Sequence, residues 1–283
     1  MDARLRRLLG PEPRGGPVTI DAAAVLARAA RGAVAVGLDD LRALLAIAGR
    51  ESMAVAPAFI AGFIAECADL RRAGRGGVIL DLWAAAGWML PRLAAALRPD
   101  RAIGVLPGGD GRDLAPFLDP AGRVEWREET DVREAVARIA PGSLDLVVGC
   151  PPWHWGPRHL TVATTSGPVA LTEDPANVAL LEACAEGLTP AGIGLFVVGP
   201  GFLMRPGPGT AFANLARFGL AVELLASLPR GIYRPDSGSG RLLIGIGRRP
   251  RGDVAAPTPL VGALTPAGSG DLLDAVRRSL GRR

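Results

Sequence analysis

Short apolar runs recur along the chain and alternate with segments whose apolar residues follow helical spacing. Runs bounded by turn residues predict buried strands, at 78–82, 102–106, 123–127, 144–148 and 192–198. Apolar residues at intervals of three and four predict helices, at 58–72, 88–97, 131–139 and 177–188. Strands that alternate with helices predict an α/β fold with a mostly parallel, doubly wound sheet.

Two further apolar runs predict the last strands of this sheet, at 222–228 and 241–247. The segment between them is too short for a crossover helix, so we expect these strands to pair antiparallel. A stretch rich in Thr, Ser, Gly and Pro, 156–175, predicts a long loop after the fourth strand. A loop of this length is typically functional or mobile.

Both ends of the chain differ in composition from the middle. Residues 1–52 predict an Arg- and Pro-rich arm followed by a small helical preface. The alternating strands and helices define one domain at 53–250. Pro and Gly predict a linker in the remaining segment, 251–283, which closes with a short amphipathic helix at 271–280.

The strand at 144–148 leads directly into Cys150, Pro151, Pro152 and Trp153. The prolines lack an amide hydrogen and have a fixed φ, so strand pairing must stop there. Trp153 is then presented at the carboxyl end of the strand, where open parallel sheets bind ligands. Two interpretations follow: a strand terminator whose Trp closes the core, or a binding site.

The first predicted strand has a related ending, because it finishes with Asp81 and continues into a turn that ends at Gly87. This pair of strand ends resembles the amino-group DNA methyltransferases that modify adenine, in particular the modification subunit of type I restriction systems. Three later segments are similar to motifs of that family, at 188–192, 199–203 and 228–232. The resemblance covers residues 53–250 and implies a Rossmann-like methyltransferase sheet.

The resemblance implies S-adenosylmethionine as the cofactor, held by a Gly-rich turn and by acids after the first strands. The matching positions are Asp81, Trp83, Ala85, Gly87, Leu106 and Glu128. In the family the target adenine is flipped out of the duplex and stacked on an aromatic residue. The matching catalytic positions are Cys150, Pro151, Pro152 and Trp153. Stacking of a base on an aromatic ring contributes ~1–3 kcal/mol, which suits Trp153.

The sequence departs from the family where the chemistry is done. Ala85 stands where the family has a glycine that admits the cofactor, and Leu106 stands where it has a Glu that grips the ribose. Cys150 replaces the Asn or Asp that accepts a hydrogen from the adenine amino group. A thiol is a weak acceptor and does not reproduce the geometry of an amide. The three changes together predict that methyl transfer is impaired or absent.

The composition of the chain says less about its binding partners than the motifs do. The chain has no lysine, so its basic side chains are all arginine, and its net charge is only +4. Such a charge permits DNA binding without requiring it. The three cysteines are widely spaced, which predicts neither a disulfide framework nor a metal site. No signal peptide or membrane span is evident, so we expect a cytoplasmic protein without membrane contact.

Three functional hypotheses remain open. The first is an S-adenosylmethionine-dependent adenine-amino DNA methyltransferase-like protein of a restriction-modification or defence system. The second is a non-catalytic descendant that binds DNA or assembles with a specificity or restriction subunit. The third is a methyltransferase that acts on RNA or protein, because x-Pro-Pro-aromatic motifs also occur in such enzymes.

Overall fold

The computed structural model describes most of the chain after residue 57. The described residues are 58–71, 76–84, 89–108, 119, 121–151, 158–164, 167–199, 201–204, 207, 209–230, 240–249, 258–268 and 270–280. The arm and helical preface predicted at 1–52 lie outside this set, as do Ala85, Gly87, Pro152 and Trp153 among the predicted site residues.

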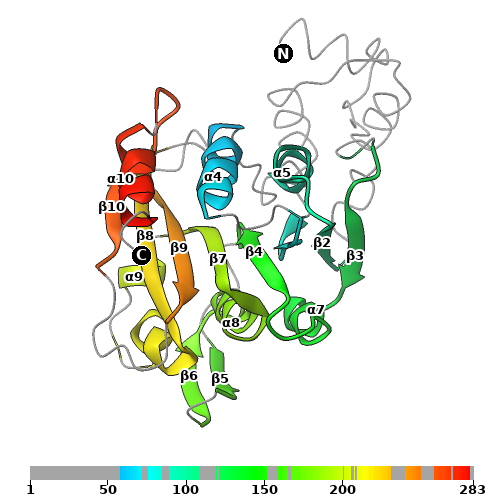
Figure 1. Ribbon diagram of the computed structural model, residues 1–283. Helices are drawn as coiled ribbons and strands as arrows, with labels where there is room; N and C mark the ends of the chain where they lie inside the picture. The colour runs from blue at the N-terminus through cyan, green and yellow to red at the C-terminus, as the bar shows by residue number, and fades with distance from the viewer. Residues whose placement is uncertain are drawn as a thin grey trace, which may run out of the picture.

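A sheet of eight strands, in the order β10-β8-β9-β7-β4-β1-β2-β3, organises the described part of the molecule (Figure 1). The strands are β1 (Val78–Asp81), β2 (Arg101–Pro107), β3 (Glu125–Glu129), β4 (Leu144–Gly149), β7 (Leu188–Val198), β8 (Leu220–Leu228), β9 (Arg241–Arg248) and β10 (Leu260–Ala263). β9 runs antiparallel to both of its neighbours, and the other pairings are parallel. The predicted fold class and the antiparallel β8–β9 pair are therefore confirmed.

The strand order reverses between β1 and β4. The chain passes from β1 to β2 and β3 on one side, then crosses back to β4 and β7 on the other. In the register of the central pair, Ile79 lies opposite Leu146, and Asp81 lies opposite Val148. A reversal of this kind leaves a crevice outside the carboxyl ends of the two central strands, which is where open α/β sheets bind ligands.

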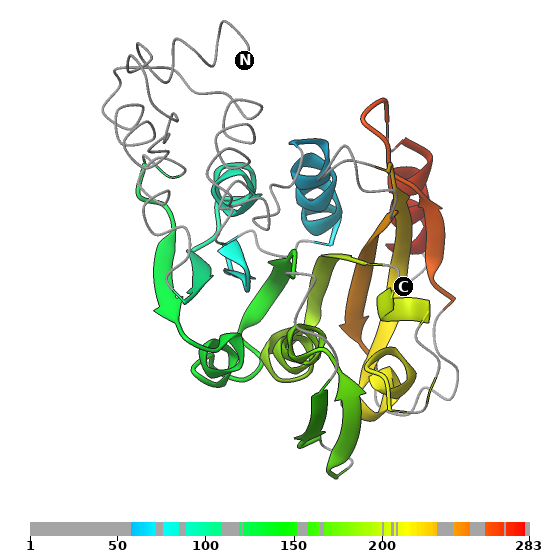
Figure 2. The ribbon, with the colours of Figure 1, turned by 180° about the vertical axis from the view of Figure 1, so that it is seen from behind.

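Helices cover both faces of the sheet (Figures 1 and 2). One face packs against α4 (Ala58–Leu70), α5 (Met89–Leu97) and α10 (Gly270–Leu280). The other packs against α7 (Val132–Ala137), α8 (Pro175–Glu182), the π-helical turn η2 (Ala183–Gly187) and the 3-10 helix η3 (Phe212–Phe218). A further short helix, α9 (Gly201–Met204), follows β7. None of the described helices is both long and apolar enough to cross a membrane.

The sequence pattern of the central strands follows from this double cover. Neighbouring residues of a strand point to opposite faces, so both must be apolar when helices lie on both sides. Ile79 packs in the cluster beneath α4 and α5, whereas Leu80 packs in the cluster beneath α7 and α8. Polar caps start the helices that follow: the carboxylates of Asp131 and Asp174 accept hydrogen bonds from the amides of Arg133 and Ala176.

The segment predicted as a long loop, 156–175, instead contains a β-hairpin. β5 (Arg158–Val162) pairs antiparallel with β6 (Val169–Glu173) beside α8, with Leu160 opposite Leu171. Val169, Leu171 and Glu173 are buried and alternate with exposed residues along β6. This period-two pattern was hidden by the Thr and Ser residues around it. The described part of the segment is therefore a hairpin packed on the core.

The segment predicted as a linker also contains secondary structure. β10 adds to the sheet parallel to β8, and Leu264 after it is buried in the core. The predicted terminal helix is present as α10, and its residues Leu272, Leu273 and Val276 pack in the same cluster as α4. Four strand residues in a Pro- and Gly-rich context are too few for periodicity to reveal.

Candidate functional site

The carboxyl ends of β1 and β4 meet at the edge of the sheet where the strand order reverses. The amide of Leu82 donates a hydrogen bond of 3.2 Å to the carbonyl of Val148, so the two chains remain paired one residue beyond β1. Asp81 and Cys150 follow directly at this edge. The structure therefore brings the first and fourth predicted motifs together.

Asp81 is a buried acid, with only 2% of its surface exposed. It shares the face of Ile79, on the α4 and α5 side, because side chains two apart on a strand point the same way. Its Oδ1 accepts a hydrogen bond of 3.1 Å from the amide of Trp83. Burial raises the pKa of Asp81 to about 7, and the hydrogen bond from Trp83 only partly offsets this. Burial therefore favours the protonated, uncharged form of this side chain.

Trp83 points to the opposite face and forms part of the core. Its indole is 8% exposed and lies in the cluster beneath α7 and α8. A Cβ on Gly149 would lie 3.1 Å from Cε3 of Trp83 and 3.8 Å from Cδ2 of Leu180. Gly149 thus provides the space that the indole occupies. The indole Nε1 is buried and has no hydrogen-bond partner among the described residues. Trp83 therefore packs in the core beneath the carboxyl ends of β1 and β4.

Cys150 follows β4 directly and is 7% exposed. It belongs to the apolar cluster of Ile79 and Val148, beneath α4 and α5. Pro151 is buried as well. The position that carries a polar amide or carboxylate in the resembling family is thus occupied here by a thiol within an apolar cluster. Pro152 and Trp153, which would form the stacking platform, lie outside the described residues.

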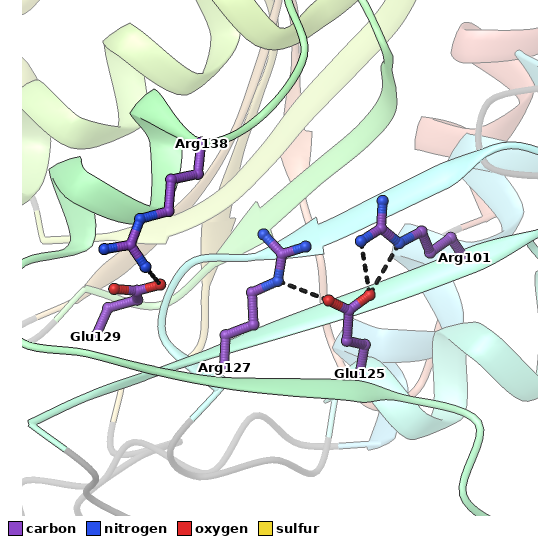
Figure 3. A network of polar contacts seen from close by, with 5 residues as sticks. All are labelled: Arg101, Glu125, Arg127, Glu129 and Arg138. Atoms are coloured by element: carbon purple, nitrogen blue, oxygen red, sulfur yellow. Dashed lines mark hydrogen bonds and ion pairs between the residues drawn. The ribbon is translucent and has the colours of Figure 1, made fainter.

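The neighbouring strand ends carry the remaining predicted residues. Leu106 in β2 is 1% exposed, and Glu128 in β3 lies opposite it in the parallel register. Glu128 is exposed, whereas the next residue, Glu129, is buried and accepts a hydrogen bond of 2.7 Å from Nη1 of Arg138 (Figure 3). Glu128 thus faces solvent, whereas the side chain of Glu129 is held by Arg138.

Sequence reasoning missed Glu173, which is fully buried between β6, α8 and η3. Its Oε1 accepts hydrogen bonds from the amide of Asp174 at 2.9 Å and from Nδ2 of Asn177 at 3.0 Å. Its Oε2 accepts a hydrogen bond from the amide of Ala211 at 3.0 Å. The acid directly before the Asp-Pro start of a helix was the available signal. The contacts assign Glu173 a structural role.

A second residue that the sequence did not single out is Arg241. It starts β9 and is buried at the same edge of the sheet as Cys150. Its Nη1 would lie 3.1 Å from a Cβ added to Gly199, which follows the end of β7. An arginine at the start of an otherwise apolar strand was the only sequence signal. Arg241 places a buried positive charge two strands away from Cys150.

A cavity of about 750 Å³ lies at the opposite edge of the sheet, near the start of β7 and the end of β9. Its described lining is Ala163, Thr164, Glu182, Ala185, Glu186, Pro190, Phe218, Gly219, Arg248 and Arg249. The guanidinium of Arg248 donates to the carbonyls of Leu188 at 3.0 Å and Ala185 at 2.7 Å. None of the predicted site residues belongs to this lining. Across the described residues, no cluster of His, Cys, Asp and Glu could hold a metal ion.

Comparisons with known proteins identify the fold of this chain at low sequence identity. No protein-family model matches the sequence, and no curated protein matches it either. A solved structure from Listeria monocytogenes, described as a class I S-adenosylmethionine-dependent methyltransferase, has a TM-score of 0.64 at 13% identity. That match covers 97% of this chain and 97% of the other.

Two further solved structures come from type I restriction systems. The methyltransferase subunit from Streptococcus thermophilus has a TM-score of 0.56 at 17% identity, over 78% of this chain and 52% of that one. The modification subunit from Vibrio vulnificus has a TM-score of 0.54 at 12% identity, over 92% of this chain and 58% of that one. This chain thus spans little more than half the length of either subunit. The sheet order and these similarities together show that the chain has the α/β fold of S-adenosylmethionine-dependent methyltransferases.

Proposed function

We propose that this protein is an adenine-amino DNA methyltransferase-like subunit of a restriction-modification or defence system that has lost methyl transfer. Its remaining role is to bind DNA or to assemble with a specificity or restriction subunit. The observation that carries the proposal is Cys150, a thiol within an apolar cluster at the end of β4. Without an amide oxygen there, the adenine amino group has no acceptor to orient it.

The cofactor positions support the same proposal. The fold implies S-adenosylmethionine, whose amino group and ribose hydroxyls need acids at the ends of β1 and β2. Burial raises the pKa of Asp81 to about 7, which favours the uncharged acid over the carboxylate that would hold the cofactor's amino group. Leu106 at the end of β2 is apolar and buried. The described residues therefore do not fit the cofactor fully, and we expect weak binding.

Calorimetric titration with S-adenosylmethionine tests the cofactor part of the proposal. We expect a dissociation constant weaker than roughly 100 µM, because a missing charge-assisted contact costs about 1.5–3 kcal/mol. Micromolar binding that Asp81→Ala abolishes would contradict this part. Leu106→Glu restores an acid at the end of β2, and we expect it to tighten binding.

Transfer of a labelled methyl group to adenine-containing duplex DNA tests the catalytic part. We expect no transfer by the wild-type protein, and transfer above background by the Cys150→Asn, Leu106→Glu double variant. Cys150→Ser is the matched control, since a hydroxyl lacks the geometry of an amide and should give no gain. Methyl transfer above background by the wild-type protein, at the level of the double variant, would show that Cys150 does not prevent catalysis.

An active methyltransferase is the second candidate function. It is favoured by Asp81, which keeps the position at the end of β1 that the resembling family uses. If the wild-type protein methylates, parallel assays with DNA, RNA and protein identify the acceptor class. The cytoplasmic location stays a prediction.

DNA binding is tested separately by a gel shift over a range of salt concentrations. We expect retention that weakens steeply with salt, because arginines that contact phosphates release counterions. Retention only in the presence of a specificity subunit would favour an assembly role, and no retention with or without that subunit would remove DNA from the proposal.

A further inference from the structure

The two edges of the sheet differ sharply in chemistry. Edge strand β3 reads Glu-Trp-Arg-Glu-Glu, and Glu125 accepts hydrogen bonds of 2.8 Å from Arg101 and Arg127 (Figure 3). Edge strand β10 reads Leu-Val-Gly-Ala and carries no charge. Charged side chains on an edge strand prevent it from pairing with another chain. Only the β3 edge has this protection.

The β10 end of the sheet also exposes apolar side chains. Val261 is 71% exposed, the largest value among the exposed large apolar residues of the described chain. Its neighbour across the strand pair is Leu225 in β8, and Ala263 lies beside Ser227. Leu260 and Gly262 face α10 instead, because a Cβ on Gly262 would lie 3.0 Å from Cδ1 of Leu272. Val261 and Ala263 therefore point to the face that α10 leaves uncovered.

Helix α10 lies beside β10 at the same end of the sheet in both views (Figures 1 and 2). Its apolar residues face the sheet, and its exposed residues are charged. The acids Asp271 and Asp274 lie in the first half, and the bases Arg277 and Arg278 lie in the second. Asp274 and Arg277 form an ion pair of 2.6 Å within the helix. A second copy of this helix, placed antiparallel, would bring Asp271 of each copy toward Arg278 of the other.

We propose that β10 and α10 form the interface of a homodimer in which the β10 strands of two copies pair antiparallel. A two-fold axis that is perpendicular to the sheet and passes between the two β10 strands, level with Val261, sets strand against strand and helix against helix in opposite directions. Antiparallel strands form hydrogen bonds between the backbone amides and carbonyls of their facing edges. The sheet then continues across the dimer, and Val261 contacts Val261 of the second copy.

The proposal commits to a second copy because the surface is self-complementary. An exposed strand edge can pair with any extended peptide, but a helix that is acidic in one half and basic in the other selects an antiparallel copy of itself. Both elements are needed. A stable interface buries on the order of 1,200–2,000 Å², which four strand residues on each side cannot supply alone.

Sedimentation equilibrium of the full chain, over concentrations up to about 100 µM, tests the proposal. We expect the wild-type protein to dimerise, and we expect Val261→Lys to weaken dimerisation by at least about tenfold, because two ammonium groups would meet at the axis. Val261→Thr is the matched control, since it keeps the β-branched shape without a charge. A wild-type protein that remains monomeric throughout this range overturns the proposal.

Charge reversal on α10 tests the helix part. We expect Asp271→Arg and Arg278→Asp each to weaken dimerisation, and the double variant to restore it toward the wild-type value. Both positions are exposed, and the thermal unfolding midpoint of each variant shows whether the monomer remains folded. A dimer that is indifferent to Val261→Lys and to both single reversals would place the interface elsewhere and contradict the assignment.

Discussion

At the scale of single residues, the packing at the end of β4 depends on the absence of a Cβ at Gly149. A Cβ at this position would lie 3.1 Å from Cε3 of the Trp83 indole, which is closer than an ordinary van der Waals contact. The glycine therefore does not serve flexibility at this position. It allows a large aromatic ring to pack beneath the strand end, directly before Cys150 and Pro151.

Gly149→Ala is expected to destabilise the protein by about 1–3 kcal/mol, because the new methyl group overpacks the indole. The measurement is the free energy of unfolding in urea. Gly62→Ala is the matched control: Gly62 is an exposed glycine inside α4 with open space around it. That change should stabilise by roughly 0.5–1 kcal/mol. A neutral Gly149→Ala would mean that the indole is free to move away.

The raised pKa of Asp81 makes stability depend on pH. An acid whose pKa rises to about 7 in the folded protein binds its proton more tightly there than in the unfolded chain, where the value is about 4. Its contribution to stability is therefore fully present below pH 4 and is lost as pH rises through 7. The loss is a few kcal/mol at most, since a unit of pKa corresponds to about 1.4 kcal/mol.

Asp81→Asn provides the test, because an amide resembles the protonated acid and does not titrate. Relative to this variant, the wild-type protein should lose unfolding free energy between about pH 4 and pH 7 and then level off. The amide can still accept the hydrogen bond from Trp83. A difference between the two proteins that does not change with pH would mean that Asp81 is ionised throughout this range.

At the scale of elements, the β5–β6 hairpin is attached to the fold through the buried carboxylate of Glu173. Three donors from three residues converge on it, and two of them are backbone amides at the starts of α8 and η3. Helix amides that lose their acceptor in the interior cost free energy, since the first amides of a helix have no carbonyl partner within the helix. The hairpin, α8 and η3 therefore depend on one side chain.

Glu173→Ala is expected to destabilise the protein by about 2–4 kcal/mol, because it leaves buried donors without an acceptor. Glu173→Gln should cost less, since its amide oxygen still accepts. The control is Glu134→Ala, which removes a carboxylate that is 60% exposed and should change stability by less than about 0.5 kcal/mol. Thermal denaturation followed by circular dichroism measures all three variants, and equal losses for Glu173→Ala and Glu134→Ala would contradict the role.

The elements differ in how well the sequence predicted them. β1, β2, β4 and β7 are buried on both faces, so their apolar runs stand out, although β7 begins at Leu188, four residues before its predicted start. The hairpin and β10 were missed because each is short and only half covered. At the site, the neighbourhood of Asp81 and Cys150 was predictable from the strand order. The face to which Trp83 turns was not, since it depends on the space left by Gly149.

At the scale of the whole molecule, elements from the beginning and the end of the described chain pack against one another. Arg71, after α4, forms an ion pair with Glu223 in β8, and both side chains are nearly buried. Helix α10 packs against α4, so a late helix covers one of the first described elements. The predicted boundary at residue 250 separates α10 and β10 from the domain. β10 nevertheless pairs with β8, and α10 packs in the same apolar cluster as α4. The boundary itself stays a prediction.

A truncation after residue 257 tests this view of the domain. It removes four buried apolar side chains, those of Leu264, Leu272, Leu273 and Val276. Each contributes about 1.5–3 kcal/mol when buried, and together they approach the whole stability of a typical domain, about 5–15 kcal/mol. We therefore expect the truncated protein to unfold or aggregate at 25 °C. Removal of residues 281–283 alone is the control, since it spares these side chains. A truncated protein that melts cooperatively near the wild-type temperature would support the predicted domain boundary at residue 250.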